Sequence, residues 1–238
     1  MIFERGKYVA NLAQDEGEVQ QAQAFRAMCF GLLDPVDSDA YDTQGAHLLV
    51  RHKSSDQLVA YYRFLTFQAS EIASSYSAQF YDLSALQSFE GPMIEIGRFC
   101  LRPDQRDPDI LRLAWGTMAA LVDQTKATLL FGCTSFEGTS WAPYADTFGY
   151  LDQRHKAPCR WQPLPKAQKT IPLGPHPNLD VTQALRRMPP LLRSYLTMGG
   201  WVSDHAVVDA QMKSLHVFTA VEIAKIPPMR KKLLRALC

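Results

Sequence analysis

Two charged residues, Glu95 and Arg98, lie inside a stretch of the chain that is otherwise apolar. This stretch, residues 93–102, reads Met-Ile-Glu-Ile-Gly-Arg-Phe-Cys-Leu-Arg, and turn residues border it on both sides, so it predicts a buried strand. A charge buried in such a strand costs about 1–3 kcal/mol or more unless it is paired or hydrogen-bonded. Fold stability alone rarely demands that cost, so the two charges indicate a functional site.

A second group of charges is a run of aspartates in the loop predicted over residues 32–45. Four carboxylates fall within nine positions, at Asp34, Asp37, Asp39 and Asp42. Because aspartate is common in turns, the run is compatible with an ordinary polar surface loop. Its density exceeds what turns need, however, and a cationic substrate would complement it.

Apolar periodicity and turn residues predict the elements that position these charges. Residues 47–50 and 58–65 read as two antiparallel strands, and the second carries Arg63. Residues 73–89 are mixed, with short helices. The other predicted strands cover residues 7–12, 93–102, 128–133, 169–173 and 216–221. The predicted helices cover residues 15–30, which include Arg26, and residues 108–125, 139–148 and 185–198, with a short basic amphipathic end over 230–235.

Length and composition describe a soluble globular protein. The chain has 238 residues, of which 47% are hydrophobic and 21% charged, so it can bury a large core and is unlike a disordered chain. It contains no apolar run of about 18 residues, so we expect no transmembrane helix. Glu4, Arg5 and Lys7 open the chain without an apolar region after them, so we expect no signal peptide.

The sequence lacks several motifs that would indicate other chemistry. Neither Gly-x-x-x-x-Gly-Lys-Ser/Thr nor Gly-x-Gly-x-x-Gly occurs, which argues against a glycine-rich phosphate loop. The five cysteines are scattered and the histidines show no His-x-x-x-His spacing, so we expect reduced cytoplasmic thiols and no metal site. No Gly-x-Ser-x-Gly motif frames Ser135, so we interpret the nearby Cys133 as a packing residue more readily than as a nucleophile.

The net charge of +1 hides an asymmetry between two parts of the chain. Residues 1–153 hold 11 Lys and Arg against 20 Asp and Glu, whereas the proline-rich residues 154–238 hold 14 against 4. A basic half favours an anionic partner such as lipid headgroups, nucleic acid or an acidic protein, although a solvated basic face without function is also compatible. No nucleic-acid-binding motif accompanies it, so we expect no nucleic-acid partner.

Two stretches of the sequence resemble known acyltransferases. Glu95-Ile96-Gly97-Arg98-Phe99 resembles the Glu-x-Ser/Gly-Arg-Phe core of GNAT-like acyltransferases that take acyl chains from acyl carrier protein. These include the N-acyl-homoserine-lactone synthases and the ornithine-lipid family of L-ornithine N-alpha-acyltransferases. Residues 37–42 are similar to the acidic run of the lactone synthases, and Arg26 and Arg63 look like their upstream arginines.

The ornithine-lipid family is the better match, because its pattern continues along nearly the whole chain. The matching segments are residues 46–51, 95–106, 129–136, 188–196, 199–202 and 206–209. The lactone synthases lack the C-terminal part of this pattern. The sequence is therefore identified as a member of the ornithine-lipid acyltransferase family by resemblance.

The resemblance implies an α/β (α+β) fold with a GNAT-like mixed central sheet flanked by helices. It implies an acyltransferase core over residues 1–153 and a basic extension over residues 154–238 packed on that core. The implied reaction moves a 3-hydroxyacyl chain from acyl carrier protein to the α-amine of ornithine, gives lyso-ornithine lipid and needs no cofactor. Acylation of glutamine or glycine, a lactone synthase that consumes S-adenosylmethionine, and a binding module without activity are the alternatives.

The resemblance also implies roles for the charged residues. Glu95 is the first candidate for the general base, because burial disfavours its charged form, and its alternative is a structural partner of Arg98 or Arg63. Arg98 would organise carboxylates. The amino acid would be held by the acidic loop and the upstream arginines, namely Arg26, Asp37, Asp39, Asp42 and Arg63. Backbone amides of Phe99, Cys100 and Leu101 would pair with the acyl-pantetheine.

The expected acyl donor follows from a departure from the coenzyme-A-dependent relatives. Those relatives have an Arg/Gln-x-x-Gly-x-Gly/Ala pyrophosphate loop where this chain has the glycine-free residues 102–108, with two carboxylates. We therefore expect carrier-protein-bound phosphopantetheine as the donor. The basic half would contact acidic carrier protein or a membrane surface, which implies a cytoplasmic protein with an option of peripheral attachment to the inner face of the membrane.

Overall fold

The computed structural model describes residues 2–237, and the chain divides into two units. The first unit comprises Met1–Thr66, Ile96–Ala127 and Pro228–Cys238, and the second comprises Phe67–Glu95 and Thr128–Pro227. This division crosses the boundary at residue 153 that the charge distribution suggested. The physical reason is strand pairing, because β7 (Leu129–Glu137) pairs along its whole length with β11 (Ser214–Glu222).

The first unit contains the strand order β1-β2-β3-β4-β6. Its strands are β1 (Ile2–Arg5), β2 (Tyr8–Leu12), β3 (Ala46–His52), β4 (Leu58–Phe67) and β6 (Met93–Leu101). The pairs β1/β2, β2/β3 and β3/β4 are antiparallel. Strand β6 begins in the second unit and enters the first at Ile96, so its two charged residues belong to different units.

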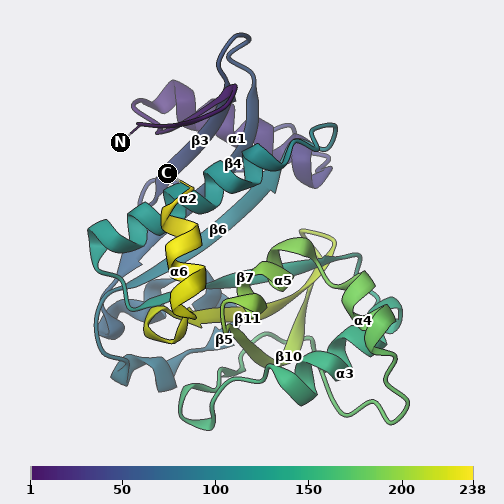
Figure 1. Cartoon of the computed structure of the whole chain (residues 1–238). Helices are drawn as coiled ribbons and strands as arrows, with labels where there is room; N and C mark the ends of the chain where they lie inside the picture. Colours follow the sequence, from purple (N-terminus) through teal and green to yellow (C-terminus); the bar gives the residue numbers. More distant parts are fainter. Residues whose placement is uncertain (1, 238) are drawn as a thin grey trace. The chain divides into compact units, whose positions relative to one another are not determined.

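Three helices complete the first unit. Helix α1 (Glu16–Phe30) begins where the Asp15 carboxylate accepts a hydrogen bond from the Glu18 amide, and it ends at Gly31 in the left-handed conformation. Helix α2 (Pro108–Thr125) buries an apolar face that includes Leu113 and Met118. The C-terminal helix α6 (Pro228–Arg235) lies beside α2 (Figure 1), and Arg235 forms an ion pair with Asp123 of α2.

The second unit contains the strand order β6-β7-β11-β10-β9, and its sheet is mixed. Strands β6 and β7 are parallel, whereas β7/β11, β11/β10 and β10/β9 are antiparallel. The remaining strands are β9 (Thr170–Pro172), β10 (Trp201–Asp209) and the separate pair β5 (Tyr81–Asp82) and β8 (Leu164–Pro165). Its α-helices are α3 (Ala145–Arg154), α4 (Val181–Arg187) and α5 (Pro190–Thr197). The 3₁₀ turns are η1 (Ala69–Ser74), η2 (Ser77–Gln79), η3 (Ser84–Ser88), η4 (Ala142–Tyr144), η5 (Cys159–Trp161) and η6 (Ile223–Lys225).

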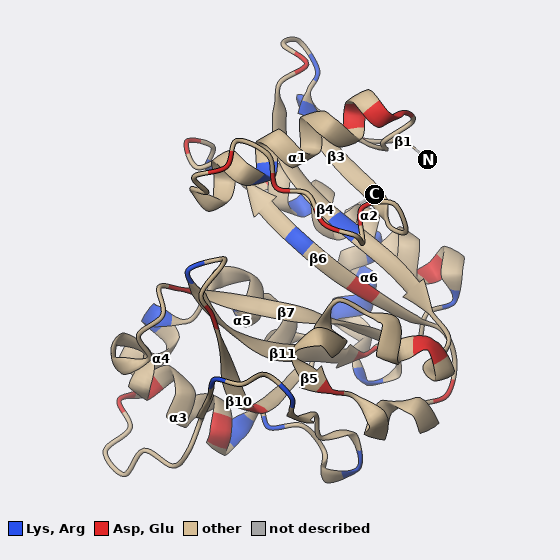
Figure 2. Cartoon of the chain, turned by 180° about the vertical axis from the view of Figure 1, so that it is seen from behind, with Lys and Arg blue, Asp and Glu red and all other residues tan. Residues whose placement is uncertain are grey.

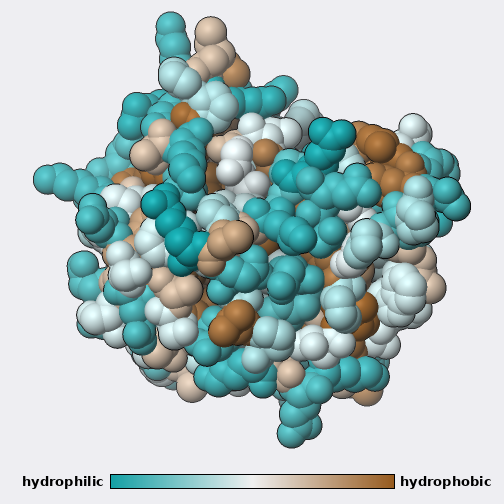
Figure 3. Space-filling view, turned by 90° about the horizontal axis from the view of Figure 1, so that it is seen from below, coloured by the Kyte–Doolittle hydropathy of each residue, from teal (hydrophilic) through white to brown (hydrophobic). Residues whose placement is uncertain are grey.

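Each unit has its own apolar core. In the first unit, Phe25 of α1, Leu49 of β3 and Cys100 of β6 are buried in one cluster. In the second unit, Phe136 of β7 and Leu192 of α5 belong to a larger buried cluster. On the face shown in Figure 3, hydrophilic residues predominate and apolar residues occur in separate small groups, as expected when most apolar side chains are buried.

The α/β class and the mixed sheet flanked by helices are confirmed, and the helices predicted over residues 15–30 and 108–125 are present. Three predicted elements were placed wrongly. The helix predicted over 139–148 begins only at Ala145, because Pro143 lies in the preceding 3₁₀ turn, and it continues to Arg154. The helix predicted over 185–198 is two helices, α4 and α5, separated at Met188–Pro189. Strand β7 extends four residues beyond the predicted end at Cys133.

Four strands within residues 2–237 were not predicted, namely β1 at the start of the chain, the two-residue strands β5 and β8, and β10 after Gly200. Among the described residues, Cys29, Cys100, Cys133 and Cys159 are free thiols. No helix within residues 2–237 is both long and apolar enough to cross a membrane.

Candidate active site

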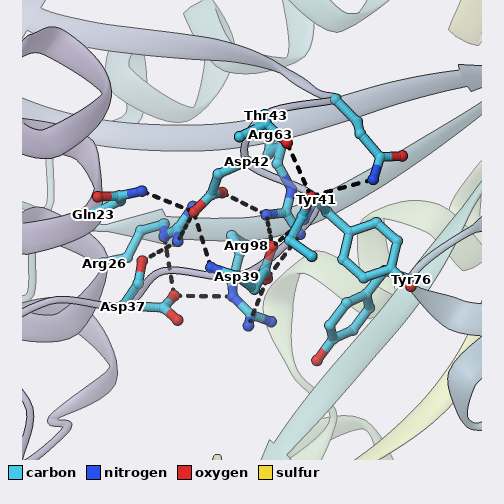
Figure 4. Close-up of polar contacts among 12 residues, drawn as sticks. Gln23, Arg26, Asp37, Asp39, Tyr41, Asp42, Thr43, Arg63, Tyr76 and Arg98 are labelled. Atoms are coloured by element: carbon cyan, nitrogen blue, oxygen red, sulfur yellow. Dashed lines mark hydrogen bonds and ion pairs between the residues drawn. The ribbon is translucent and has the colours of Figure 1, made fainter. Parts of the chain in front are cut away.

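Three arginines and three aspartates form a cluster of ion pairs within the first unit (Figure 4). The arginines come from α1, β4 and β6, and the aspartates come from the loop after α1, whose acidic positions are red in Figure 2. The six residues are Arg26, Arg63, Arg98, Asp37, Asp39 and Asp42. All six were predicted as site residues, and the structure brings them together.

Arg26 is the most deeply buried member of the cluster, with no exposed surface. Its guanidinium forms a bidentate pair with Asp42, with Nη1–Oδ1 at 2.7 Å and Nη2–Oδ2 at 2.9 Å. Its Nε lies 3.0 Å from Oδ2 of Asp37, and its Nη2 also donates to the Asp37 backbone carbonyl. Arg26 therefore ties the acidic loop to helix α1.

Arg63 occupies the middle of β4 and is 1% exposed. Its Nη1 lies 2.5 Å from Oδ1 of Asp39 and 2.5 Å from Oδ1 of Asp42. Gly45 makes room for it, since a Cβ added there would lie 2.7 Å from Cγ of Arg63. The glycine at the start of β3 is thus required by the close passage of the arginine.

Arg98 closes the cluster from β6. Its Nε lies 2.9 Å from Oδ2 of Asp37, and its Nη2 lies 3.1 Å from Oδ2 of Asp39. Its backbone has φ = 55°, in the left-handed region that costs a residue with a side chain about 1–2 kcal/mol. An unusual backbone conformation at a residue that bridges two carboxylates is typical of a functional site.

The shared charges set the protonation of the cluster. Burial alone would raise the pKa of Asp42, but the hydrogen bond from Arg26 and the charges of Arg26 and Arg63 hold that pKa well below its ordinary value. Burial disfavours the charged form of Arg26 and would lower its pKa. The hydrogen bond to Asp42 acts in the opposite direction, and the Arg26 pKa lies above its ordinary value. Asp42 and Arg26 are therefore charged throughout the physiological range.

Two neutral groups border the cluster. The Tyr61 hydroxyl accepts a hydrogen bond from Arg26 at 3.2 Å and lies 2.7 Å from Nδ1 of His47. Burial raises the pKa of Tyr61 and lowers the pKa of His47, so both stay uncharged near neutral pH. Sequence reasoning did not single out either residue, since a Tyr and a His in apolar strands normally serve as core residues.

The cluster changes the interpretation of the acidic loop. Its three carboxylates face three guanidinium groups, so the six charges balance and the loop is not the unpaired acidic surface that the sequence suggested. The side chains of Asp39 and Arg98 remain the most exposed of the six, at 18% and 11%. A small zwitterion could exchange contacts with this carboxylate and this guanidinium.

Glu95 is 1% exposed, and three hydrogen-bond donors to its carboxylate lie within the second unit. Its Oε2 accepts from the Tyr76 amide at 2.9 Å. Its Oε1 accepts from the Ser77 amide at 2.7 Å and from the Ser77 hydroxyl at 2.6 Å. Backbone amides only donate, so both carboxylate oxygens act as acceptors. Residue types alone do not indicate these partners, because the position of a backbone donor depends on the fold.

The chain resembles known acyltransferases. Residues 21–116 match the acetyltransferase (GNAT) domain. The chain is 29% identical to the L-ornithine N(alpha)-acyltransferase of Rhodobacter capsulatus over 90% of each chain. It is 28% identical to the protein of the same name from Brucella abortus, over 93% of this chain and 86% of that one. The chain is therefore similar to these L-ornithine N(alpha)-acyltransferases over most of its length.

The fold agrees with this similarity. The solved apo form of TofI matches 96% of this chain and 99% of its own length, with a TM-score of 0.50 at 12% identity. At this identity the similarity concerns the fold alone. The chain thus has the GNAT-like mixed sheet that the resemblance of its sequence implied.

The three residues predicted to pair with acyl-pantetheine lie at the end of strand β6. Phe99 stacks on Tyr62, with ring centroids 6.0 Å apart and planes 11° from parallel. Cys100 is buried in the core of the first unit, and Leu101 is half-buried. The role of their backbone amides in donor binding stays a prediction.

The N-terminus of helix α2 carries carboxylates. Asp107 accepts a hydrogen bond from the Asp109 amide at 3.0 Å, which lowers the Asp107 pKa below its ordinary value. Asp107 also pairs with Lys7 at 3.3 Å, and Asp109 pairs with Arg5 at 3.0 Å. This helix terminus is therefore capped and neutralised by the protein's own side chains.

Proposed function

We propose that the protein transfers a 3-hydroxyacyl chain from acyl carrier protein to the α-amine of ornithine. The observation that carries this proposal is the similarity to the Rhodobacter capsulatus L-ornithine N(alpha)-acyltransferase over 90% of both chains. The product is an N-acylated amino acid with a long chain, a lyso-ornithine lipid. The reaction is therefore the first acylation of a membrane aminolipid.

The chemistry needs a neutral amine and a polarised thioester. A base takes one proton from the α-ammonium, the amine attacks the thioester carbon, the C–N bond forms and the C–S bond breaks. The leaving thiolate takes up a proton and stays on the carrier's pantetheine. We assign the base to Glu95, because it is a buried carboxylate held in one orientation by three donors.

We assign amino-acid binding to the exposed edge of the arginine and aspartate cluster. Asp39 would hold an ammonium group of ornithine, and Arg98 would hold its carboxylate. Asp42, Asp37 and Arg26 are more deeply buried and already paired, so they support those two side chains. The balance of charge in the cluster suits a substrate that carries both signs.

The N-terminus of α2 supports a carrier-bound donor. A coenzyme A pyrophosphate at this terminus would meet Asp107 and Asp109, whereas a phosphopantetheine on a carrier protein places no pyrophosphate there. The expected result is efficient turnover with 3-hydroxyacyl carrier protein and at least about tenfold lower kcat/KM with the matching acyl-coenzyme A. Equal use of both donors would contradict this assignment.

We propose that helix α6 attaches the protein to the anionic inner surface of the membrane. Met229 and Leu233 lie one helical turn apart and are 68% and 55% exposed. Arg230, Lys231 and Lys232 lie among them, and Lys and Arg colour much of α6 blue in Figure 2. Apolar residues that can enter the headgroup region next to basic residues are typical of interfacial helices.

Vesicle flotation tests this attachment. The wild type should float with phosphatidylglycerol vesicles, and Met229→Gln with Leu233→Gln should lose that binding. Normal binding of this variant would contradict the proposal. If Arg230→Gln with Lys232→Gln raised the KM for carrier protein and left vesicle binding unchanged, α6 would instead be a carrier-protein surface.

An acceptor panel tests the reaction itself. The purified protein is given 3-hydroxyacyl carrier protein with ornithine, lysine, glutamine, glycine or S-adenosylmethionine, and the products are read by mass spectrometry. Acyl-ornithine as the main product supports the proposal. Acyl-glutamine, acyl-glycine or a homoserine lactone as the main product would replace it with the corresponding alternative.

A further inference from the structure

Ser77 lies outside the sequence motifs and is fully buried in the second unit. Its hydroxyl lies 2.6 Å from Oε1 of Glu95, and its amide lies 2.7 Å from the same oxygen. The Sγ of Cys133, on β7, lies 3.5 Å from the Ser77 hydroxyl oxygen. Ser77 thus bridges a thiol and the carboxylate assigned as the base.

The direction of this hydrogen-bond chain follows from the chemistry of its members. The Ser77 hydroxyl donates its single proton to Oε1 of Glu95, which also accepts from the Ser77 amide. The lone pairs of the hydroxyl oxygen then accept from the Cys133 thiol, which is a weak donor. Cys133 therefore orients Ser77, and Ser77 orients Glu95.

Neighbouring strands place Glu95 and Cys133, the two ends of this series of hydrogen bonds, on one face of the sheet. Glu95 of β6 pairs in register with Phe131 of β7, and Cys133 lies two residues further along β7, on the same face as Phe131. Turn η2 supplies Ser77 to both of them. Ser77, Glu95 and Cys133 therefore come together from three separate segments of the sequence.

We propose that Ser77 is a positioning residue of the acyl transfer, which holds the Glu95 carboxylate in its reactive orientation. This inference rests on the proposed function of Glu95 as the base. Glu95 has three rotatable side-chain bonds, and the amides of residues 76 and 77 together with the Ser77 hydroxyl fix them. Without the hydroxyl, Oε1 keeps the Ser77 amide as a donor but loses the shorter hydrogen bond, so the carboxylate is held less firmly in its reactive orientation.

Ser77→Ala tests this role by steady-state kinetics against pH. We expect kcat to fall about 10- to 100-fold, as for a misplaced catalytic group, while KM for amino acid and donor changes by less than about threefold. We also expect the acidic limb of the pH–rate profile to move to higher pH, because a donor to the charged carboxylate is gone. Ser77→Thr keeps the hydroxyl and should restore both the rate and the profile.

Two comparisons separate positioning from a general packing role. Ser74→Ala removes the hydroxyl of an exposed serine in the same region, which bonds the Glu71 carbonyl at 2.7 Å, and should leave kcat and the profile unchanged. Ser77→Cys keeps the volume but weakens the donor, and should give an intermediate rate if Ser77→Ala does not fold. A folded Ser77→Ala or Ser77→Cys protein with wild-type kcat and pH profile would overturn the inference.

The same experiments distinguish an error about Ser77 from an error about the proposed function. If the wild type acylates no amine at all, both the proposed function and the role of Ser77 fall. If the wild type is active and Glu95→Gln is equally active, Glu95 is not the base and the positioning role of Ser77 falls with it. If Glu95→Gln is inactive and both folded Ser77 variants match the wild type, the inference about Ser77 alone is wrong.

Discussion

Arg26 and Asp42 form a bidentate ion pair in which the arginine has no exposed surface and the aspartate is 7% exposed. The pair joins helix α1 to the loop that leads into β3. Asp42 also forms an ion pair with Arg63, whose Nη1 lies 2.5 Å from Oδ1 of Asp42. One carboxylate therefore compensates two buried guanidinium groups.

Asp42→Asn should destabilise the protein by about 3–5 kcal/mol, because it leaves two buried arginines with reduced compensation. Denaturant unfolding followed by circular dichroism measures this change. Asp56→Asn is the matched control, since Asp56 pairs with Arg51 at 3.7 Å but its side chain is 84% exposed. The control should change stability by less than about 1 kcal/mol. Equal, small effects of both substitutions would contradict the structural role of Asp42.

Asp39→Asn should act on substrate binding more than on stability. Asp39 is the most exposed aspartate of the cluster, and we assign it to an ammonium group of the amino acid. The KM for ornithine should rise about tenfold, with a smaller change in kcat. Asp34→Asn, in the same loop and exposed, is the control and should leave KM unchanged. An unchanged KM in Asp39→Asn would remove this carboxylate from the substrate site.

Glu95→Gln should lower kcat by at least about 100-fold, as expected on loss of a general base. It should also cost about 1–3 kcal/mol, because the amide group of glutamine would face a backbone donor at residue 76 or 77. Chemical denaturation and single-turnover kinetics on the same sample separate the two effects. Glu137→Gln, on the exposed end of β7, is the control. Near-normal turnover in Glu95→Gln would exclude the base role.

His216 should make stability depend on pH in the mildly acidic range. Burial lowers its pKa to about 4. The nearby Asp209 raises this pKa and His205 lowers it, each by less than burial does. The unfolded chain, with an ordinary pKa near 6.5, binds a proton at higher pH than the folded one. Stability is therefore complete above about pH 6.5 and falls by roughly 3 kcal/mol as the pH drops toward 4.

The test is the difference between wild type and His216→Gln in unfolding free energy from pH 7 to pH 4. Other buried histidines, such as His47, add to the slope of both proteins in the same direction. The variant should therefore show a shallower decline than the wild type. Parallel curves would show that His216 contributes no such dependence.

The sequence predicted the helices and the charged residues better than their contacts. Helix α2 was correct at both ends because Pro108, an unbroken apolar stripe and the following turn all agreed. Strand β10 was missed because its apolar run follows Gly199-Gly200 and was assigned to no element. The six members of the cluster were recognised, but their mutual pairing was not, because a list of charges does not show which of them neutralise each other.

The environment of Glu95 could not have been predicted in this way. Its donors come from residues 76 and 77, which lie 19 and 18 positions earlier in a region without clear periodicity. Ser77 lies in no motif, and two of the three hydrogen bonds come from backbone amides. Only the folded path of turn η2 places these groups on the carboxylate.

The position of the new bond tests the account most directly. The purified protein is incubated with 3-hydroxyacyl carrier protein and ornithine that carries ¹⁵N only at the α-amine, and the product is fragmented by mass spectrometry. The account predicts acyl-ornithine in which the amide nitrogen is ¹⁵N, formed in proportion to the carrier protein deacylated. Carrier protein that stays acylated, or an acyl chain on the unlabelled side-chain nitrogen, would contradict it.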